Sequence, residues 1–329
     1  MRMGEQLGLD RVALIAALAL VLVLVFGAPA IGLLKRAGAG QRVRNDGPQR
    51  HLQKEGTPTM GGILIIGAAA VAAVLGQLWV GRRVTLEMGL LLAVTLAFAC
   101  IGAADDWMKI NRGRSLGLRA RQKLVFQLIV SVAFAYAIVG QRAVEAASGS
   151  ASAGPVTMGW ALLWVVALAT TSNAVNLSDG LDGLASGLCA IAGAGFAVLA
   201  IRAGDQSAAI VATALTGACL GFLFYNRHPA RIFMGDVGAL ALGGGLAALA
   251  VWLHEPLALI GLCLVPFIEA GSVVIQVISF KTTGKRVFKM SPLHHHFELS
   301  GWPERRVVAV FWAVALVAAA IVVVTSLSA

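Results

Sequence analysis

The most constraining feature of this sequence is a series of long apolar runs, several of them about 20 residues in length, separated by short polar segments. A helix of about 20 residues is long enough to cross the hydrocarbon core of a bilayer. Charged residues make up only 13% of the chain, whereas an ordinary soluble domain has about 25%. Because the backbone must satisfy its own polar groups in lipid, and β-barrel alternation is absent, we expect an all-α polytopic membrane protein.

The apolar runs predict ten transmembrane helices, at about 12–34, 61–80, 88–104, 122–140, 159–176, 184–202, 207–225, 237–253, 257–280 and 306–327. The first is kept as a helix and not as a cleaved signal peptide, because the basic cluster follows the apolar run. Most of the 26 Lys and Arg residues fall in one alternate set of loops. An excess of positive charge marks cytoplasmic loops, so we expect both termini outside. Topology, and not nucleic-acid binding, then accounts for the net charge of +10.

A polar stretch from Asn173 to Gly183 joins the fifth span to the sixth, and it contains two carboxamides and two carboxylates. Such groups cost about 2.5–3.5 kcal/mol each at a bilayer centre, so they belong at the membrane edge or in a wet cleft. If the stretch is helical, Asn173, Asn176 and Asp179 recur along one face and Asp182 follows. The pattern favours a site for a hydroxyl-rich, amide-bearing or metal-chelated ligand; a polar loop between helices is the alternative.

Two further acidic motifs fall on the same expected cytoplasmic side. Asp105 and Asp106 end the third span, where adjacent carboxylates repel unless a cation lies between them and where they oppose the helix dipole. Asp236 lies in the motif Phe233-Met-Gly-Asp-Val-Gly, which enters the eighth span. These placements indicate function. The alternative for Asp105 and Asp106 is an acidic helix cap that arose by chance, and the alternative for Asp236 is an ordinary N-cap.

Basic and imidazole side chains complete the set. Lys54 begins the segment Lys-Glu-Gly-Thr-Pro-Thr59-Met-Gly-Gly before the second span, where it can hold a phosphate as a point charge or belong to a plain loop-to-helix cap. Three consecutive imidazoles, His294 to His296, cannot all point one way, so a tetrahedral zinc site from these alone is not expected. They suit binding of phosphate or carboxylate groups.

Together these loops supply carboxylate oxygens suited to Mg²⁺ and cations suited to phosphates. The sequence has no Walker A or kinase signature, and no G-x-G-x-x-G motif that follows a strand. We therefore expect phosphoryl transfer at the cytoplasmic membrane face, between a lipid phosphate and a water-soluble nucleotide donor.

Five motifs carry a resemblance to a known family: in order, GTPTMGG, DDW, NAVNLSDGLDGLA, FMGDVGALALGG and PLHHHFE. They resemble the phospho-N-acetylmuramoyl-pentapeptide-transferase family, within the polyprenyl-phosphate N-acetylhexosamine-1-phosphate transferase superfamily. The resemblance runs from about Arg42 to Trp302 and departs only at Ser178, where Thr is usual, and at Trp107, where another aromatic residue is common.

The resemblance implies one transmembrane transferase domain over residues 1–329, in a bacterial inner membrane, with its active site facing the cytoplasm. It implies UDP-MurNAc-pentapeptide and undecaprenyl phosphate as substrates, lipid I and UMP as products, Mg²⁺ as cofactor, and a homodimer. Asp105 is implied to deprotonate the lipid phosphate with Asp106 beside it, and Asp236 to bind the metal. The implied substrate-binding residues are Lys54, Thr59, Asn176, Asp179, Asp182, Phe233, Gln276, His294, His295 and His296.

Several alternatives stay open at this point. A sibling enzyme that transfers GlcNAc-1-phosphate to a polyprenyl phosphate shares the acidic motifs. A cation-coupled transporter also uses carboxylates in membrane spans, but it places them near mid-span, often in inverted repeats. Both direct attack by the lipid phosphate and a covalent aspartyl-phosphate are compatible with the sequence.

Overall fold

A computed structural model describes residues 8–40, 54, 56–80, 83–112, 116–147 and 158–328, apart from the side chains of residues 9 and 142–147. Over these residues the chain is all-α, as predicted. Its helices are α1 (Leu9–Arg36), α2 (Gly62–Trp79), α3 (Leu86–Arg112), α4 (Ala120–Ala147), α5 (Met158–Ser178), α6 (Leu184–Arg202), α7 (Gln206–Asn226), α8 (Gly235–Leu253), α9 (Pro256–Leu262), α10 (Leu264–Thr283), α11 (Leu293–Leu299) and α12 (Glu304–Ser328).

Ten of these helices are long and apolar enough to cross a membrane, which confirms a multi-pass membrane protein with ten candidate spans. The predicted boundaries need two corrections. The third span does not end at 104, because α3 continues to Arg112. The ninth does not begin at 257, because the chain breaks at Cys263 into the short α9 and the longer α10. Pro266 lies in the first turn of α10, where a missing N–H is tolerated, and it cannot continue the hydrogen-bonding of a preceding helix.

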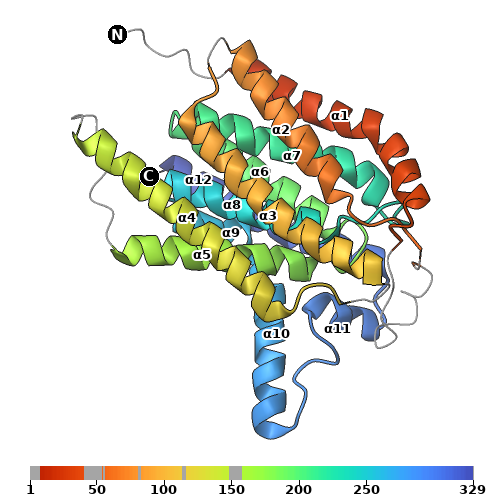
Figure 1. Ribbon diagram of the computed structural model, residues 1–329. Coiled ribbons are helices and arrows are strands. Elements are labelled where there is room, and N and C mark those ends of the chain that lie inside the picture. The colour runs from red at the N-terminus through yellow and green to blue at the C-terminus, as the bar shows by residue number, and fades with distance from the viewer. Residues whose placement is uncertain are drawn as a thin grey trace.

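Helix α8 is the centre of the bundle, with the other long helices arranged around it (Figure 1). Nearly all of its residues are buried, and many are Gly or Ala. A Cβ at Gly243 would lie 2.6 Å from the Cα of Ser172 on α5, and one at Gly244 would lie 2.7 Å from the ring of Phe98 on α3. Small residues let helix backbones approach closely, so α3 and α5 pack directly on α8.

The outer helices carry apolar side chains that stay exposed. Leu33 on α1, Val274 and Phe280 on α10, and Val317 on α12 are each more than half exposed. Helix α10 projects away from the bundle before the chain returns to α11 (Figure 1). Exposed apolar surface of this extent is typical of helices that face lipid.

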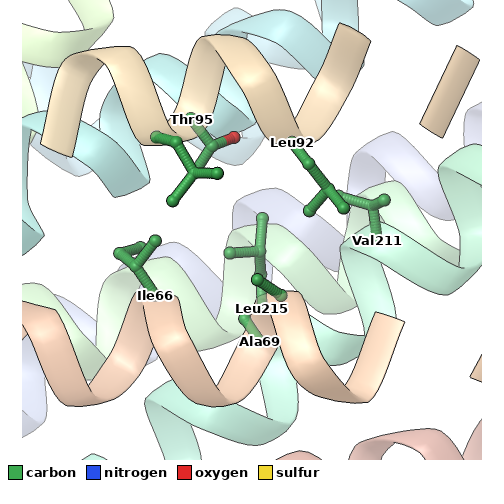
Figure 2. A pocket seen from close by; sticks show the side chains of 8 residues that line it. Ile66, Ala69, Leu92, Thr95, Val211 and Leu215 are labelled. Atoms are coloured by element: carbon green, nitrogen blue, oxygen red, sulfur yellow. The ribbon is translucent and has the colours of Figure 1, made fainter. Parts of the chain in front are cut away.

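Within the bundle, packing leaves little free space between α2, α3 and α7. Figure 2 shows a pocket there, lined by apolar side chains that include Ile66, Leu92 and Val211. Its volume is only about 10 Å³, roughly the space of one water molecule. Thr95, the polar residue in its wall, donates its hydroxyl to the carbonyl of Leu91 at 2.7 Å. The pocket is a packing gap and not a ligand site.

One end of the bundle is tied together by its loops. The loop before α8 pairs with the loop before α2: Phe233 N donates to Pro58 O at 2.8 Å, and Gly61 N donates back to Phe233 O at 2.9 Å. Gly62 and Gly238 touch at the start of the two helices, since a Cβ at Gly62 would lie 2.0 Å from the Gly238 nitrogen. This contact fixes the first turn of α8 against α2.

Candidate active site

Three aspartates from two helices form the centre of the candidate site. Asp105 and Asp106 lie on α3 and Asp236 lies in the first turn of α8, and each offers a carboxylate oxygen within 4.8 Å of the others. Asp105 and Asp106 are buried, whereas Asp236 is partly exposed. The structure thus brings Asp236 to an acidic pair that lies 130 residues earlier in the sequence.

Two lysines hold this cluster together. Lys109 Nζ lies 2.6 Å from Asp105 Oδ2, 3.3 Å from Asp106 Oδ1 and 3.1 Å from Asp236 Oδ1. Lys123 on α4 lies 3.4 Å from Asp105 Oδ1 and also pairs with Asp236 Oδ2. Sequence reasoning missed both as site residues, because lysines are ordinary at the cytoplasmic end of a span. The spacing of Lys109 three and four residues after the acidic pair is the signal that could have found it.

Backbone groups fix the orientation of the two buried carboxylates. Leu118 N donates to Asp105 Oδ1 at 2.8 Å, and Val237 N donates to Asp106 Oδ2 at 3.1 Å. Gly235 has φ of +72°, and a Cβ there would lie 2.5 Å from Asp106 Oδ2. Only glycine meets both demands, the left-handed backbone and the close approach. The structure therefore explains why the Phe-Met-Gly-Asp motif has glycine at this position.

One expectation about local placement was wrong, and the N-cap alternative for Asp236 fails as well. Because α3 runs on to Arg112, Asp105 and Asp106 lie inside the helix and do not oppose its C-terminal dipole. Met234, and not Asp236, is the N-cap residue of α8. The Asp236 carboxylate instead accepts hydrogen bonds from side chains of other helices, including Asn176 Nδ2 at 3.0 Å. Its place in the first turn still suits a negative charge.

The polar stretch after α5 contributes to the cluster only in part. Helix α5 ends at Ser178, so Asp179 lies in a turn and the single-face prediction fails beyond that point. Burial, together with the negative charges of Asp236 and Asp106, raises the pKa of the Asp179 carboxyl well above its usual value. Asn176 and Asp179 therefore belong to the surroundings of the aspartate cluster, as does Thr59, whose hydroxyl would lie 2.9 Å from a Cβ at Gly235.

Asp182 lies in a separate ionic cluster. Lys54 Nζ lies 2.7 Å from both Asp182 Oδ1 and Glu304 Oε1. His228 Nδ1 lies 3.0 Å from Asp182 Oδ2 and 3.3 Å from Glu304 Oε2. Burial opposes the charged form of Lys54, but the charge of Glu304 and the hydrogen bonds to Asp182 and Glu304 outweigh it and raise the lysine pKa.

Sequence reasoning missed His228 and Glu304, since neither lies in a recognisable motif. The cluster joins residues from before α2, from the α5–α6 turn, from the loop before α8 and from the start of α12. Asp182 is buried. Its two carboxylate oxygens contact Lys54 and His228, and one of them also accepts a hydrogen bond of 3.0 Å from the nitrogen of Ala230. It therefore does not share a cation with Asp236 in this arrangement.

The remaining candidates lie at the edge of this region. Phe233 is partly exposed, and its backbone makes the loop pairing described above. Gln276 on α10 accepts from the nitrogens of Val287 and Phe288 at 3.0 and 2.9 Å and donates to the Phe288 carbonyl at 2.9 Å. Gln276 thus holds the return loop after α10 to that helix.

The three histidines point in different directions, as expected. They lie on the short helix α11, not in a loop. His294 is buried and pairs with Glu269 on α10, with Nδ1 3.1 Å from Oε2. His295 Nδ1 lies 2.9 Å from Glu298 Oε2, and His296 Nδ1 accepts from the nitrogen of Lys289 at 3.1 Å.

The aspartate cluster has the donors that Mg²⁺ prefers, namely several carboxylate oxygens close to one another. Lys109 already contacts a carboxylate oxygen of all three residues, so the cluster accommodates one cationic group between α3 and α8. Asp182, His228 and Glu304 also lie within 4.8 Å of one another, but they offer two carboxylates and an imidazole, whereas the aspartate cluster offers three carboxylates. Because Mg²⁺ prefers oxygen ligands, the fit to this ion is better at Asp236.

The chain is similar to known proteins over most of its length. The family model "Glycosyl transferase family 4" matches residues 88–254, and phospho-N-acetylmuramoyl-pentapeptide-transferase signature 1 matches residues 54–66. The phospho-N-acetylmuramoyl-pentapeptide-transferase of Desulforudis audaxviator is 50% identical over 316 residues, which cover 92% of this chain and 95% of the relative.

Two other relatives of that name are similar over most of their length. That of Halalkalibacterium halodurans is 44% identical, over 94% of this chain and 95% of its own, and that of Moorella thermoacetica is 46% identical, over 92% and 94%. Sequence identity of this level over nearly the whole chain shows that these proteins are homologous. The chain belongs to the phospho-N-acetylmuramoyl-pentapeptide-transferase family.

Proposed function

We propose that this chain transfers phospho-MurNAc-pentapeptide from UDP-MurNAc-pentapeptide to undecaprenyl phosphate, giving lipid I and UMP in the first membrane step of peptidoglycan synthesis. The observation that carries the proposal is the cluster of Asp105, Asp106 and Asp236 with Lys109 and Lys123, at one end of a bundle of apolar helices. Phosphoryl transfer is catalysed mainly by positioning and by charge stabilisation, and this cluster supplies both signs of charge at a membrane edge.

We also propose Mg²⁺ as cofactor, with Asp236 as its ligand. The Asp236 side chain is 13% exposed, against 1% for Asp105 and 3% for Asp106, so it is the carboxylate that an incoming diphosphate reaches. Asn176 holds one of its oxygens at 3.0 Å. When bound, Mg²⁺ would neutralise the donor diphosphate and stabilise the departing UMP.

The buried acids and the lysines then have distinct roles. Asp105 is proposed as the base for the lipid phosphate, whose second pKa of about 6 makes the assistance modest at neutral pH. Asp105 reaches that phosphate only when Lys109 or Lys123 shifts from it toward the substrate. The two ammonium groups act as point charges for the transferred phosphoryl group, and Asp106 holds Lys109 in place.

The donor is proposed to lie over the surrounding loops. Thr59, Asn176, Asp179 and Phe233 border the aspartate cluster and suit the nucleoside. Lys54 pairs with both Asp182 and Glu304, so the first effect of Lys54 and Asp182 is to hold together the segments that border the donor. Gln276, His295 and His296 lie on or beside α11, on the side assigned to the sugar and peptide, with His294 buried beneath them.

The site is proposed to face the cytoplasm of a bacterium, with both chain termini outside and the chain paired as a homodimer. The excess of Lys and Arg at the site end of the bundle supports this orientation. Arg42, Arg44 and Arg50, which the sequence predicts on the same side, lie outside the described residues. A donor that is made in the cytoplasm reaches the site directly in this arrangement.

A donor swap tests the proposal. Purified protein with undecaprenyl phosphate and Mg²⁺ should release UMP from UDP-MurNAc-pentapeptide and not from UDP-GlcNAc, and chelation by EDTA should stop the reaction. Preference for UDP-GlcNAc would identify the sibling GlcNAc-1-phosphate transferase instead. Absence of UMP with both donors would favour the cation-coupled transporter, which the family membership argues against.

A further inference from the structure

A fully buried acid–imidazole pair joins α10 to α11 beneath the three histidines. Glu269 and His294 are both 0% exposed. Glu269 accepts from the backbone nitrogen of His294 at 3.2 Å and lies 3.1 Å from its ring Nδ1. Among the described residues no other basic side chain pairs with Glu269, and a buried carboxylate needs such a partner. The pair therefore holds α11 against α10.

The same contact determines which way His294 faces. Because a carboxylate only accepts, Nδ1 carries the proton and Nε2 points to the other side of the ring. Nε2 is buried and has no hydrogen-bond partner among the described residues. It lies against Gly180, where a Cβ would come within 2.3 Å of it. The imidazole occupies the space that any larger residue at position 180 would need.

Gly180 follows Asp179 in the turn that borders the aspartate cluster. No hydrogen bond joins the Asp179 carboxyl to another side chain in the described part of the chain. Its position is thus fixed by the backbone of the turn, through Asp179 N donating to Asn176 O at 3.3 Å and through the packing of Gly180 on His294. A shift of the imidazole moves the turn, and with it Asp179.

We propose that Glu269 is a positioning residue for the nucleotide donor: it fixes His294 against Gly180 and thereby sets the place of Asp179 at the site. The inference rests on the proposed function, because it requires Asp179 to contact the donor. Glu269 lies inside an apolar run, in which it is the only acidic residue. A lone acid in an apolar span is a signal of function, and sequence reasoning passed over it.

Two substitutions disturb this contact from opposite sides. Glu269→Gln keeps the size of the side chain but lets its amide donate to Nδ1, which moves the imidazole proton to Nε2. Gly180→Ala pushes the ring away with one methyl group. Gly271→Ala on α10 is the matched control, because a Cβ there meets nothing within 4 Å.

The experiment measures the Kd of UDP-MurNAc-pentapeptide by calorimetry, and KM for donor and for undecaprenyl phosphate. Both variants should weaken donor binding about tenfold with the KM for lipid little changed, and Gly271→Ala should match the wild type. In an Asp179→Asn background, Glu269→Gln should cost no further donor affinity, because the two act through one contact.

Additive losses in that double-mutant cycle, or equal increases in both KM values with a lower Tm, would show a merely structural role for Glu269 and overturn the inference. These outcomes differ from failure of the proposed function. If that fails, the wild-type protein itself neither binds the MurNAc donor nor releases UMP from it.

Discussion

Asn176 near the end of α5 donates a hydrogen bond of 3.0 Å from Nδ2 to Oδ1 of Asp236 in the first turn of α8. The carboxamide thus fixes the most exposed carboxylate of the aspartate cluster. It leaves the other oxygen, Oδ2, to Lys123. Lys109 also lies 3.1 Å from Oδ1. An acid held by an amide and two ammonium groups can exchange an ammonium group for a divalent cation, and the first prediction concerns it.

Asp236→Asn should lower the rate of UMP release by about 10³-fold or more, because an amide is a poor ligand for Mg²⁺ and the cluster loses a charge. The fold should persist, since Asn can still pair with Asn176. Steady-state turnover and thermal unfolding in detergent measure both. Retained Mg²⁺-dependent turnover in the variant would reject the role of Asp236 as metal ligand.

Asp105→Asn should slow transfer by about 10²–10⁴-fold if this residue is the base. Higher pH should recover part of the loss, because the lipid phosphate then loses its proton without assistance. The measurement is the pH profile of turnover for variant and wild type under saturating substrates. A rate near that of the wild type at every pH would remove Asp105 as the base.

The pKa of Asp179 predicts a pH-dependent stability difference. Burial and the charges of Asp236 and Asp106 raise that pKa in the folded state, so the folded protein keeps this proton at pH values where the unfolded chain has lost it. Stability from this group is present below the unfolded pKa near 4 and falls as pH rises. Asp179→Asn avoids that loss.

Without ligand, the Tm of Asp179→Asn should therefore exceed that of the wild type by roughly 2–4 °C at pH 8, and the difference should shrink toward pH 4. Thermal unfolding across this range measures it. The same difference at all pH values would show that Asp179 is not held in its protonated form by its surroundings.

Lys54→Met should destabilise the second ionic cluster. It leaves Asp182 and Glu304 without the ammonium group that lies 2.7 Å from each. Because Asp182 is buried, we expect a loss of about 1–3 kcal/mol in the free energy of unfolding. Adding Glu304→Gln to that variant should restore part of the loss, as one uncompensated charge is removed. No recovery in the double variant would mean that charge pairing is not what the lysine contributes.

The sequence predicts the spans well, because apolar length and the position of Lys and Arg are properties of a local segment. It also places the acidic motifs at one end of the bundle, since alternate helix ends face the same side. What it does not show is the pairing of side chains across helices. Lys109 and Lys123 look like ordinary topology signals until α3, α4 and α8 are packed together.

Other departures have equally physical causes. Asp182 is six residues from Asn176, but the helix ends at Ser178 and Asp182 lies beside Lys54. The break at Cys263 depends on where Pro266 falls in a helix whose start is not marked by composition. The role of Glu269 could not be predicted from its position in an apolar run alone, because its partner, His294, belongs to a different helix.

The central claim is that the cation for phosphoryl transfer is held between α3 and α8. Crystals of the protein grown with UDP-MurNAc-pentapeptide and Mn²⁺ test it most directly, through the anomalous signal of the metal. We predict one peak in contact with a carboxylate oxygen of Asp236 and with the donor diphosphate. A peak instead at Asp182, His228 and Glu304, with none at Asp236, would contradict this account.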